Sequence, residues 1–462
     1  MSLTGILAFI LILGAAVIIH EFGHFIVAKL LGIRVETFSV GFGKRLWGRR
    51  YGTTDYRLSL IPLGGYVKLG GDESNAGLEE GGGEEIPTRE RFDLRPRWQK
   101  FLVGVAGPVM NILTAVTIPL VTAMTVGVPV EPAPVVSTVQ QGSAAEAAGI
   151  RPGDRIVSFN GKDDPEWDRI DNDAAIMPNQ PLPLTVERGG ERVSLTITPT
   201  AGDYNGNVIG ELGMTPDYGD VPVIITHVTP DSSAAEAGLQ PGDRILSLNG
   251  QPPLSSGHVI SFIRRHKDAP VQIKFRRGEE VREVSASVRK MPDGSEIIGI
   301  RTDTILPARR LGAGAALSYA VDKNIEFLRL TGLALGQVFT GNRSVRDTIA
   351  GPIGIAQESA NAVSSLGWSG FFGMLMILSL NLGIFNLLPI PVLDGGMIFM
   401  LLVEGVLAWM GVKLSMAMRE RIQQVGFVFL LLLMGFVIIN DVAKVASRLR
   451  GPSSPPAATQ QK

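Results

Sequence analysis

The stretch VIIHEFGHFIV, residues 17–27, places two histidines and a glutamate inside an apolar run. No charged residue occurs between Leu3 and Ile19, and apolar residues resume directly after His24. A transmembrane helix needs about 20 mostly apolar residues, so this run is long enough to span a bilayer. Ionisable side chains at that depth cost free energy and usually serve a function. The stretch therefore predicts a membrane span that carries a functional site.

The ionisable residues of this stretch are His20, Glu21 and His24, which lie within the sequence HEFGH. Residues four apart on a helix share a face, so both imidazoles can reach one metal ion. The glutamate between them can act as a general base, as in the HExxH motif of zinc metalloproteases. The alternative is a buried His–Glu pair with a structural role. Two of only five histidines lie here, which favours the metal site.

Composition limits the class of protein. A chain of 462 residues predicts more than one domain, and a formal net charge of −1 without a basic run gives no support for nucleic-acid binding. The absence of cysteine excludes disulfides and any cysteine-based catalytic or metal site. The first apolar run lacks a basic leader and is too long for a cleavable signal peptide, and cleavage would remove the HEFGH motif.

Four segments are long and apolar enough to span a membrane: residues 3–31, 101–130, 368–388 and 425–439. Lysine and arginine are abundant in the loops after the first and third segments, which predicts that both loops are cytoplasmic. Both termini and the large middle region are then predicted to lie outside. A few basic residues after the last segment oppose this orientation, but the first loop contains far more.

The middle region contains a repeat. GSAAEAAGIRPGDRIVSFNGK at residues 142–162 is echoed by SSAAEAGLQPGDRILSLNGQ at residues 232–251. Each copy reads as a small-residue helix, a glycine stop, a PGD turn and a strand that ends at Asn-Gly. The pattern resembles the PDZ fold of bacterial envelope proteases, which binds extended peptides at a sheet edge. Spacer domains or a lid that binds no peptide are the alternatives.

A catalytic zinc site usually has three protein ligands and one open position. The stretch NLLPIPVLDGG, residues 386–396, offers Asp394 as the third ligand. Pro389 and Pro391 should break the helix just before it, and a broken helix at membrane depth is tolerated where it lines a cavity. Glu404 is a weaker candidate. The three remaining histidines belong to the repeat region, in the opposite predicted compartment.

HEFGH in the first span with NLLPIPVLDGG in a later one resembles the site-2 intramembrane metalloprotease family, in its bacterial form with tandem PDZ domains. The resemblance covers nearly the whole chain. It implies that His20, His24 and Asp394 bind Zn²⁺ and that Glu21 is the catalytic base. Met397 stands where close relatives are expected to have histidine, outside the ligand set. Further residues are implied to contact substrate: Asn386 on its backbone, with Pro389 and Pro391 shaping the groove.

Residues 37–71 read as strands interrupted by glycine, which fits the membrane-dipping β-hairpins of that family. An edge strand there could pair with an unwound substrate; the alternative is a soluble hairpin without a substrate role. The second span contains GPVMN, in which Pro108 distorts the helix and Asn111 is polar at the presumed level of the active site. The predicted substrate-contacting residues of these two segments are Gly41, Phe42, Gly43, Gly64, Gly65 and Asn111.

Apolar residues recur at helical spacing after the second repeat. They predict an amphipathic helix on the outer membrane face or, as an alternative, a helix packed on the second repeat domain. The residues of this stripe are Leu317, Val321, Ile325, Leu328, Leu335 and Phe339.

The predicted fold class is a polytopic α-helical membrane protein with four transmembrane helices, a membrane-associated β-hairpin region and two α+β PDZ domains. The predicted segments are 1–31 (first span), 32–97 (cytoplasmic loop with hairpins), 98–130 (second span), 131–220 and 221–305 (PDZ domains), 306–366 (amphipathic segment), 367–410 (third span), 411–424 (link), 425–446 (fourth span) and 447–462 (disordered tail). Residues 72–90 read as a solvated acidic loop.

The resemblance implies a zinc metalloendopeptidase that cuts transmembrane segments of single-span proteins already trimmed on the outer side. In that family the substrates include a membrane-bound anti-sigma factor of an envelope stress response and remnant signal peptides. The other implied partners are peptides at the PDZ domains and membrane lipid. The implied location is the bacterial cytoplasmic (inner) membrane, with the PDZ domains and both termini periplasmic and the active site near the cytoplasmic side.

Two other functions compete with this one. A non-catalytic scaffold could gather envelope proteins through its PDZ pair. A conventional metalloprotease could cut soluble peptides at the cytoplasmic face, although the apolar surroundings of Asp394 argue against it.

Overall fold

The computed structural model describes residues 3–71, 86–204, 207–219, 221–266, 269–290, 296–345, 350–411 and 415–449. Most of the predicted acidic loop, part of the 411–424 link and nearly all of the predicted tail lie outside these residues. The chain divides into two compact units. The first unit comprises residues 1–124, 312–328 and 338–462, and the second comprises residues 125–311 and 329–337.

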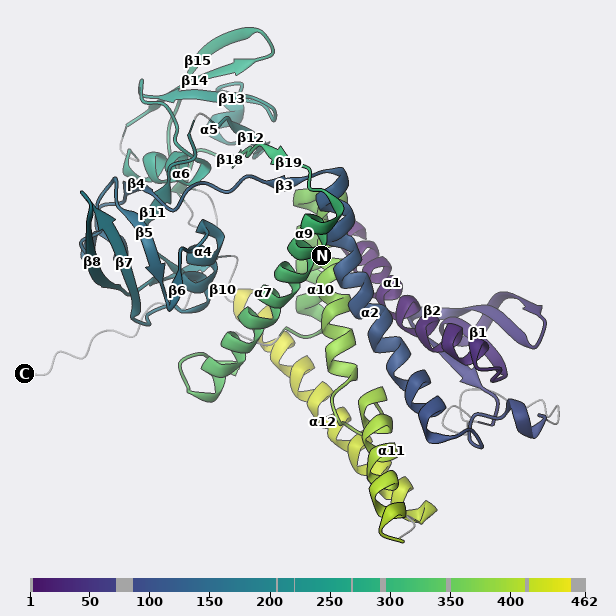
Figure 1. The fold of residues 1–462 in the computed structure, drawn as a ribbon. Helices are drawn as coiled ribbons and strands as arrows, with labels where there is room; N and C mark the ends of the chain where they lie inside the picture. Colours follow the sequence, from purple (N-terminus) through teal and green to yellow (C-terminus); the bar gives the residue numbers. More distant parts are fainter. Residues whose placement is uncertain are drawn as a thin grey trace, which may run out of the picture. The chain divides into compact units, whose positions relative to one another are not determined.

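Long apolar helices dominate the first unit (Figure 1). Each of the four predicted spans corresponds to a helix that is long and apolar enough to cross a membrane. These helices are α1 (Leu3–Leu30), α2 (Arg97–Thr125), α10 (Trp368–Asn386) and α12 (Met416–Leu449). Helix α2 ends before the predicted limit at residue 130, because Val128–Pro129 forms β3 and pairs with β19 (Ala308–Arg309).

A shorter helix, α9 (Pro352–Leu366), packs with α1 and α10. Ile12 and Ala16 of α1 are fully buried in this core. At the start of α9, the Asp441 carboxylate of α12 accepts backbone N–H groups from Gly351, Ile353 and Gly354 at 2.9–3.1 Å. The first N–H groups of a helix have no partner within the helix, so Asp441 satisfies them and complements the helix dipole.

The predicted break before Asp394 is present. Helix α10 ends at Asn386, and α11 (Asp394–Trp409) begins with the aspartate itself. The intervening turn holds Pro389 and Pro391, neither of which can continue the α10 hydrogen-bond pattern. Val392 in this turn has φ +88°. That conformation is costly for a β-branched residue, so the turn before Asp394 stores backbone strain.

The first loop forms one long β-hairpin, in agreement with the predicted hairpin region, and this hairpin curls into a bent ribbon. Strand β1 (Val35–Tyr51) pairs with β2 (Thr54–Leu69), and residues 37–40 align both with residues 65–68 and with residues 55–58. The ribbon therefore folds back on itself, and residues 65–69 form one of its edges. A short 3₁₀ turn, Thr88–Glu90, follows before α2.

The second unit contains two α/β modules of the same fold. Strands of the first module are β4 (Val136–Val139), β5 (Arg155–Phe159), β6 (Lys162–Asp163), β7 (Leu182–Arg188), β8 (Glu191–Ile197), β9 (Thr200–Tyr204), β10 (Asn207–Glu211) and β11 (Met214–Pro216), with helices α3 (Ala144–Ala147) and α4 (Trp167–Ile176). Strands of the second module are β12 (Val223–Val228), β13 (Arg244–Leu248), β14 (Val271–Arg277), β15 (Glu280–Ala286), β16 (Arg289–Lys290), β17 (Glu296–Ile297) and β18 (Ile300–Thr304), with helices α5 (Ser233–Glu236) and α6 (Ser256–Arg265). Each module has its own buried core.

An ion pair recurs at the same place in both modules. Asp154, 1% exposed, accepts hydrogen bonds from Nε and Nη2 of Arg188 at 2.7 Å, and Asp243 accepts the same pair from Arg277 at the same distances. Each arginine also donates to a glycine carbonyl, at Gly149 or its counterpart. These aspartates are those of the two PGD turns, so the repeat seen in the sequence is a repeat of structure.

The amphipathic stripe falls in helix α7 (Ala313–Phe339), as predicted. The stripe residues are largely exposed, with Phe339 at 90%. Ala316 and Ala320 are buried instead, followed by Asn324, whose Nδ2 donates to the Ala115 carbonyl of α2 at 3.0 Å. Small and polar residues therefore form the protein-facing side of α7, and apolar residues face outward.

Candidate metal centre and active site

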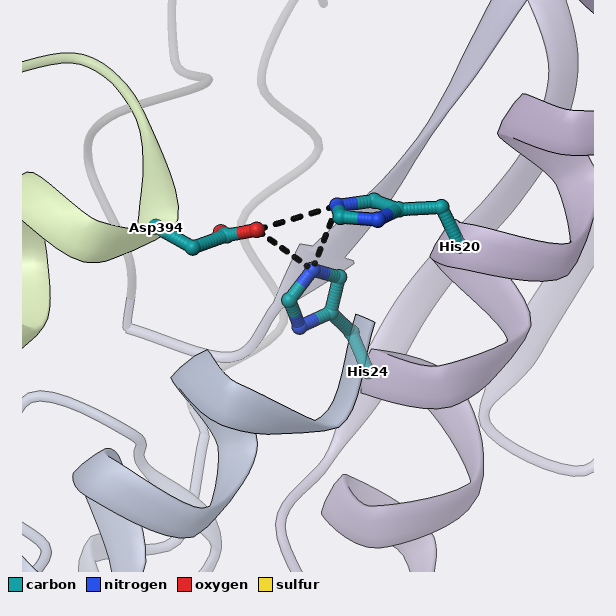
Figure 2. Close-up of side chains that lie close together, drawn as sticks. All are labelled: His20, His24 and Asp394. Atoms are coloured by element: carbon teal, nitrogen blue, oxygen red, sulfur yellow. Dashed lines mark hydrogen bonds and ion pairs between the residues drawn. The ribbon is translucent and has the colours of Figure 1, made fainter. Parts of the chain in front are cut away.

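Three side chains meet where α1 approaches the start of α11 (Figure 2). His20 Nε2 lies 3.0 Å from Asp394 Oδ2, and His24 Nε2 lies 3.4 Å from the same oxygen. The two Nε2 atoms are 3.2 Å apart. Among the described residues, these three form the group of histidine and carboxylate side chains able to hold a metal ion.

The donor set and its spacing fit zinc. Bonds of about 2.0–2.1 Å in a tetrahedral site separate ligand atoms by roughly 3.3 Å, close to the separations observed here. Asp394 Oδ2 is buried and makes no hydrogen bond in the described part of the chain beyond these close approaches to the two imidazoles, so a bound metal ion would coordinate an oxygen that otherwise lacks a partner. Two imidazoles and one carboxylate leave the fourth position open, as catalytic zinc sites require.

Helix α2 supports both imidazoles. The Nδ1 atom of His24 lies 2.7 Å from the Val103 carbonyl, and that of His20 lies 3.2 Å from the Asn111 amide. Between them is Gly107, where a Cβ atom would lie 2.3 Å from His24 Nε2 and 2.8 Å from His20 Nε2. Val103 and Gly107 were not anticipated from the sequence. The GPVMN segment drew attention to Asn111, but a supporting backbone carbonyl leaves no sequence signal.

The curled ribbon reaches Glu21. The backbone N–H of Val67 hydrogen-bonds to the Glu21 carboxylate. A Cβ atom at Gly65 would lie 3.7 Å from Glu21 Cγ. The edge formed by residues 65–69 therefore passes beside the predicted base, and Glu21 itself is one residue from His20.

The other predicted ribbon residues have neighbours within the ribbon itself or none nearby. Gly64 has φ +146°, and a Cβ atom there would overlap the Phe42 ring at 2.3 Å. Phe42 also stacks on Tyr66, with centroids 6.1 Å apart. Gly41 closely approaches the Ile61 carbonyl, whereas no described atom lies within 4 Å of a Cβ placed at Gly43. In the ribbon, Gly65 therefore lies beside Glu21, and the absence of a side chain at Gly64 leaves room for the Phe42 ring.

Asn386 lies at the end of α10, beside His20. Its Nδ2 is 3.2 Å from His20 Nε2. Pro389 and Pro391 occupy the turn that follows, and a Cβ atom at Gly426 of α12 would meet the Pro391 ring at 2.3 Å. Of the predicted substrate residues in this segment, Asn386 therefore contacts the cluster, and Pro391 contacts α12.

The weaker sequence candidates lie elsewhere. Glu404 follows Asp394 by nearly three turns of α11, about 15 Å along the axis. The histidines of the repeat region belong to the second unit. Met397 packs against α2, where its Cε lies 2.5 Å from a Cβ placed at Gly104. The residue that replaces the expected histidine is therefore part of the α2–α11 contact.

Comparison with known proteins adds to this geometry. The model of peptidase family M50 matches residues 8–433. The chain is 31% identical to regulator of sigma-E protease RseP of Escherichia coli K12 over 95% of its own length and 98% of that protein. It is 30% identical to a provisionally named zinc metalloprotease of Vibrio cholerae, with the same coverage of both chains.

A match among solved structures is the PDZ domain of an SdrC-like protein from Listeria monocytogenes. It is 24% identical and covers 19% of this chain and 90% of that one, with a TM-score of 0.16, which carries no argument about fold. The family model and the full-length relatives, together with a His₂Asp cluster beside a glutamate, place the chain in a known group. It belongs to peptidase family M50 and is a site-2 intramembrane zinc metalloprotease of the RseP type.

Proposed function

We propose that this protease cuts the transmembrane segments of single-span proteins whose outer domains have already been removed. Membrane-bound anti-sigma factors of an envelope stress response and remnant signal peptides are the proposed substrate classes. The observation that carries the proposal is Glu21, which lies within a long apolar helix, between two metal-binding histidines and beside the ribbon edge.

The chemistry divides among the residues of the site. His20, His24 and Asp394 would hold the zinc ion, which when bound polarises the scissile carbonyl and acidifies the attacking water. Glu21 takes the proton from that water and later returns it to the leaving amine. The Val67 N–H holds the Glu21 carboxylate in place for both transfers. Asn386, whose Nδ2 lies 3.2 Å from His20 Nε2, would hold the substrate backbone.

A peptide bond within a helix is shielded by its own hydrogen bonds, so substrate must become extended before it is cut. The edge at residues 65–69 can pair with such an extended segment. This edge passes Glu21, which supports a role for Gly64 and Gly65 in presenting substrate. Gly41, Phe42 and Gly43 would shape the ribbon rather than touch the scissile bond, since Phe42 packs on Tyr66 and at Gly64.

The two modules of the second unit are proposed to be PDZ domains that face the periplasm. Their matched Asp–Arg pairs and strand order support two copies of one fold. The basic first loop supports a cytoplasmic position for the ribbon and a periplasmic one for the modules and both termini. On this orientation, the modules would exclude substrates that retain a bulky outer domain or bind the trimmed end.

The test compares zinc-loaded wild type with Glu21→Gln on a single-span reporter without an outer domain, with fragments mapped by mass spectrometry. We expect cleavage within the span by wild type and a loss of about 10²–10⁴-fold in Glu21→Gln, the usual contribution of a general base. A soluble unfolded polypeptide serves as the control substrate and should be cut poorly.

Two results would overturn the proposal. If zinc-loaded wild type cut none of the reporter helices, the result would favour a non-catalytic scaffold. Equal cleavage of the soluble polypeptide and the reporter would favour a conventional metalloprotease at the cytoplasmic face.

A further inference from the structure

One face of α2 lies against His20 and His24 over two successive helical turns. Val103, Gly107 and Asn111 are spaced by four residues, so they lie on one side of the helix. The Val103 carbonyl contacts His24, and Asn111 contacts His20. Gly107 lies opposite the point where the two Nε2 atoms converge.

The two histidines need the same proton arrangement to bind a metal through Nε2. A lone pair on Nε2 faces the metal only when the ring proton is on Nδ1, and that proton needs an acceptor. For His24 the acceptor is the Val103 carbonyl, which can only accept, at 2.7 Å. Backbone geometry alone therefore fixes the tautomer of His24.

His20 has a side chain in the corresponding place. Asn111 is fully buried, and its amide lies 3.2 Å from His20 Nδ1. Its Oδ1 is buried without a hydrogen-bond partner in the described part of the chain. The oxygen and the NH₂ group of a side-chain amide have nearly the same shape, so their positions are assigned from the hydrogen bonds that each can make. Turning the amide places Oδ1 at Nδ1, which gives the His20 proton its acceptor and Oδ1 its donor.

We propose that Asn111 is a positioning residue for the metal centre. Its Oδ1 accepts the Nδ1–H of His20 and thereby holds the tautomer whose Nε2 lone pair faces the zinc ion. This role replaces direct contact with substrate, the role expected from the sequence. The inference rests on the zinc site of the proposed function, but it concerns metal affinity and is measurable without cleavage.

The experiment uses full-length protein in detergent. Zinc affinity is measured by competition with a chromophoric chelator, and the ligand field is measured from the visible spectrum of the Co²⁺-loaded protein. Asn111→Leu removes the acceptor at similar volume, and Asn111→Asp keeps it. Thr117→Val is the matched control, because Thr117 is an exposed residue of the same helix that bonds only to the Leu113 carbonyl in the described structure.

We expect Asn111→Leu to bind zinc about 10–100-fold more weakly, the usual effect of losing a partner of a metal-bound histidine. Its Co²⁺ spectrum should change, and kcat should fall while KM stays constant. Asn111→Asp should keep an affinity close to that of wild type, because a carboxylate also accepts the Nδ1–H. Thr117→Val should match wild type. If Asn111→Leu does not fold, Asn111→Ala serves as the acceptor-free variant.

Three outcomes would overturn the inference: wild-type zinc affinity in the acceptor-free variant, an equal loss in Asn111→Asp, or a raised KM with unchanged affinity. The last would restore the substrate-contact role. Failure of the proposed function looks different, since wild type would then bind zinc and cut no reporter while the affinity series could still follow the acceptor.

Discussion

Gly107 shows how a single missing side chain shapes the active site. A Cβ atom there would lie 2.3 Å from His24 Nε2, closer than nonbonded atoms approach. The imidazoles therefore occupy the volume that any other residue would fill. The same logic applies to Gly23 of α1, where a Cβ atom would lie 2.3 Å from the Ala106 carbonyl oxygen. Two glycines thus allow α1 and α2 to approach closely enough for metal binding, as small residues do between membrane helices.

Gly107→Ala should lower zinc affinity by about tenfold or more while the protein stays folded. Alanine favours the helix by about 1 kcal/mol over glycine, which offsets part of the roughly 1–3 kcal/mol that overpacking against the imidazoles costs. Zinc content after gel filtration and chelator competition would measure the loss. Gly373→Ala in α10 is the matched control, because no described atom lies within 4 Å of the added Cβ. Full zinc occupancy in Gly107→Ala would contradict the close approach of α2.

At the scale of elements, the two long-range contacts of α12 stand out. Its Asp441 caps α9, and its Gly426 meets Pro391 in the turn before α11. Few residues in the apolar part of α12 are buried, and both of these contacts join it to other segments of the first unit. Because α9 packs on α1, the cap links α12 indirectly to the helix that carries the histidines.

Asp441→Leu should destabilise the first unit by about 1–3 kcal/mol, because three backbone N–H groups would lose a buried charged acceptor. Asp441→Asn keeps one acceptor oxygen and should cost less. Thermal unfolding in detergent would measure both. Asp322→Asn, an exposed position on α7, should stay within about 0.5 kcal/mol of wild type. Equal unfolding of wild type and Asp441→Leu would show that the cap adds no stability.

The sequence predicted the elements better than the contacts between them. HEFGH, the two prolines and the PGD repeat act through local geometry, so the metal-binding helix, the break before Asp394 and the paired modules could be recognised from residues alone. The curled register of β1 and β2, the cap by Asp441 and the Val103 carbonyl depend on residues far apart in the chain. A carbonyl belongs to every residue, so no composition marks the one that will hold an imidazole.

For the whole molecule, the second unit has its own cores and its own pH response. Glu131, which precedes the first module, lies near Asp168 of α4. Burial, and then the hydrogen bond to Asp168 and the negative charges of Asp168 and Glu166, raise the pKa of Glu131 to about 7. The folded state therefore holds a proton on Glu131 across a range where the unfolded chain has lost it.

Residues 125–311 produced alone should become more stable as the pH falls from about 7.5 to 5. A raised carboxyl pKa contributes stability that is present at low pH and is lost as the pH rises through the folded-state value. Thermal unfolding across this range would measure the effect. Glu131→Gln should reduce the slope without abolishing it, because burial and the charge of Asp168 also raise the pKa of Asp171 to about 7. Glu191→Gln, on an exposed position of β8, should leave the slope unchanged. An unchanged slope in Glu131→Gln would assign the dependence to other groups.

The position of the metal ligands along the chain has a consequence for biosynthesis. His20 and His24 belong to α1, and Asp394 belongs to α11, 370 residues after His24 in the chain. A ribosome-bound chain presents α1 to the membrane long before the third ligand exists. On the proposed ligand set, a chain that ends before Asp394 lacks the third ligand and should not hydrolyse substrate. The order of the ligands delays hydrolysis until Asp394 has been synthesised.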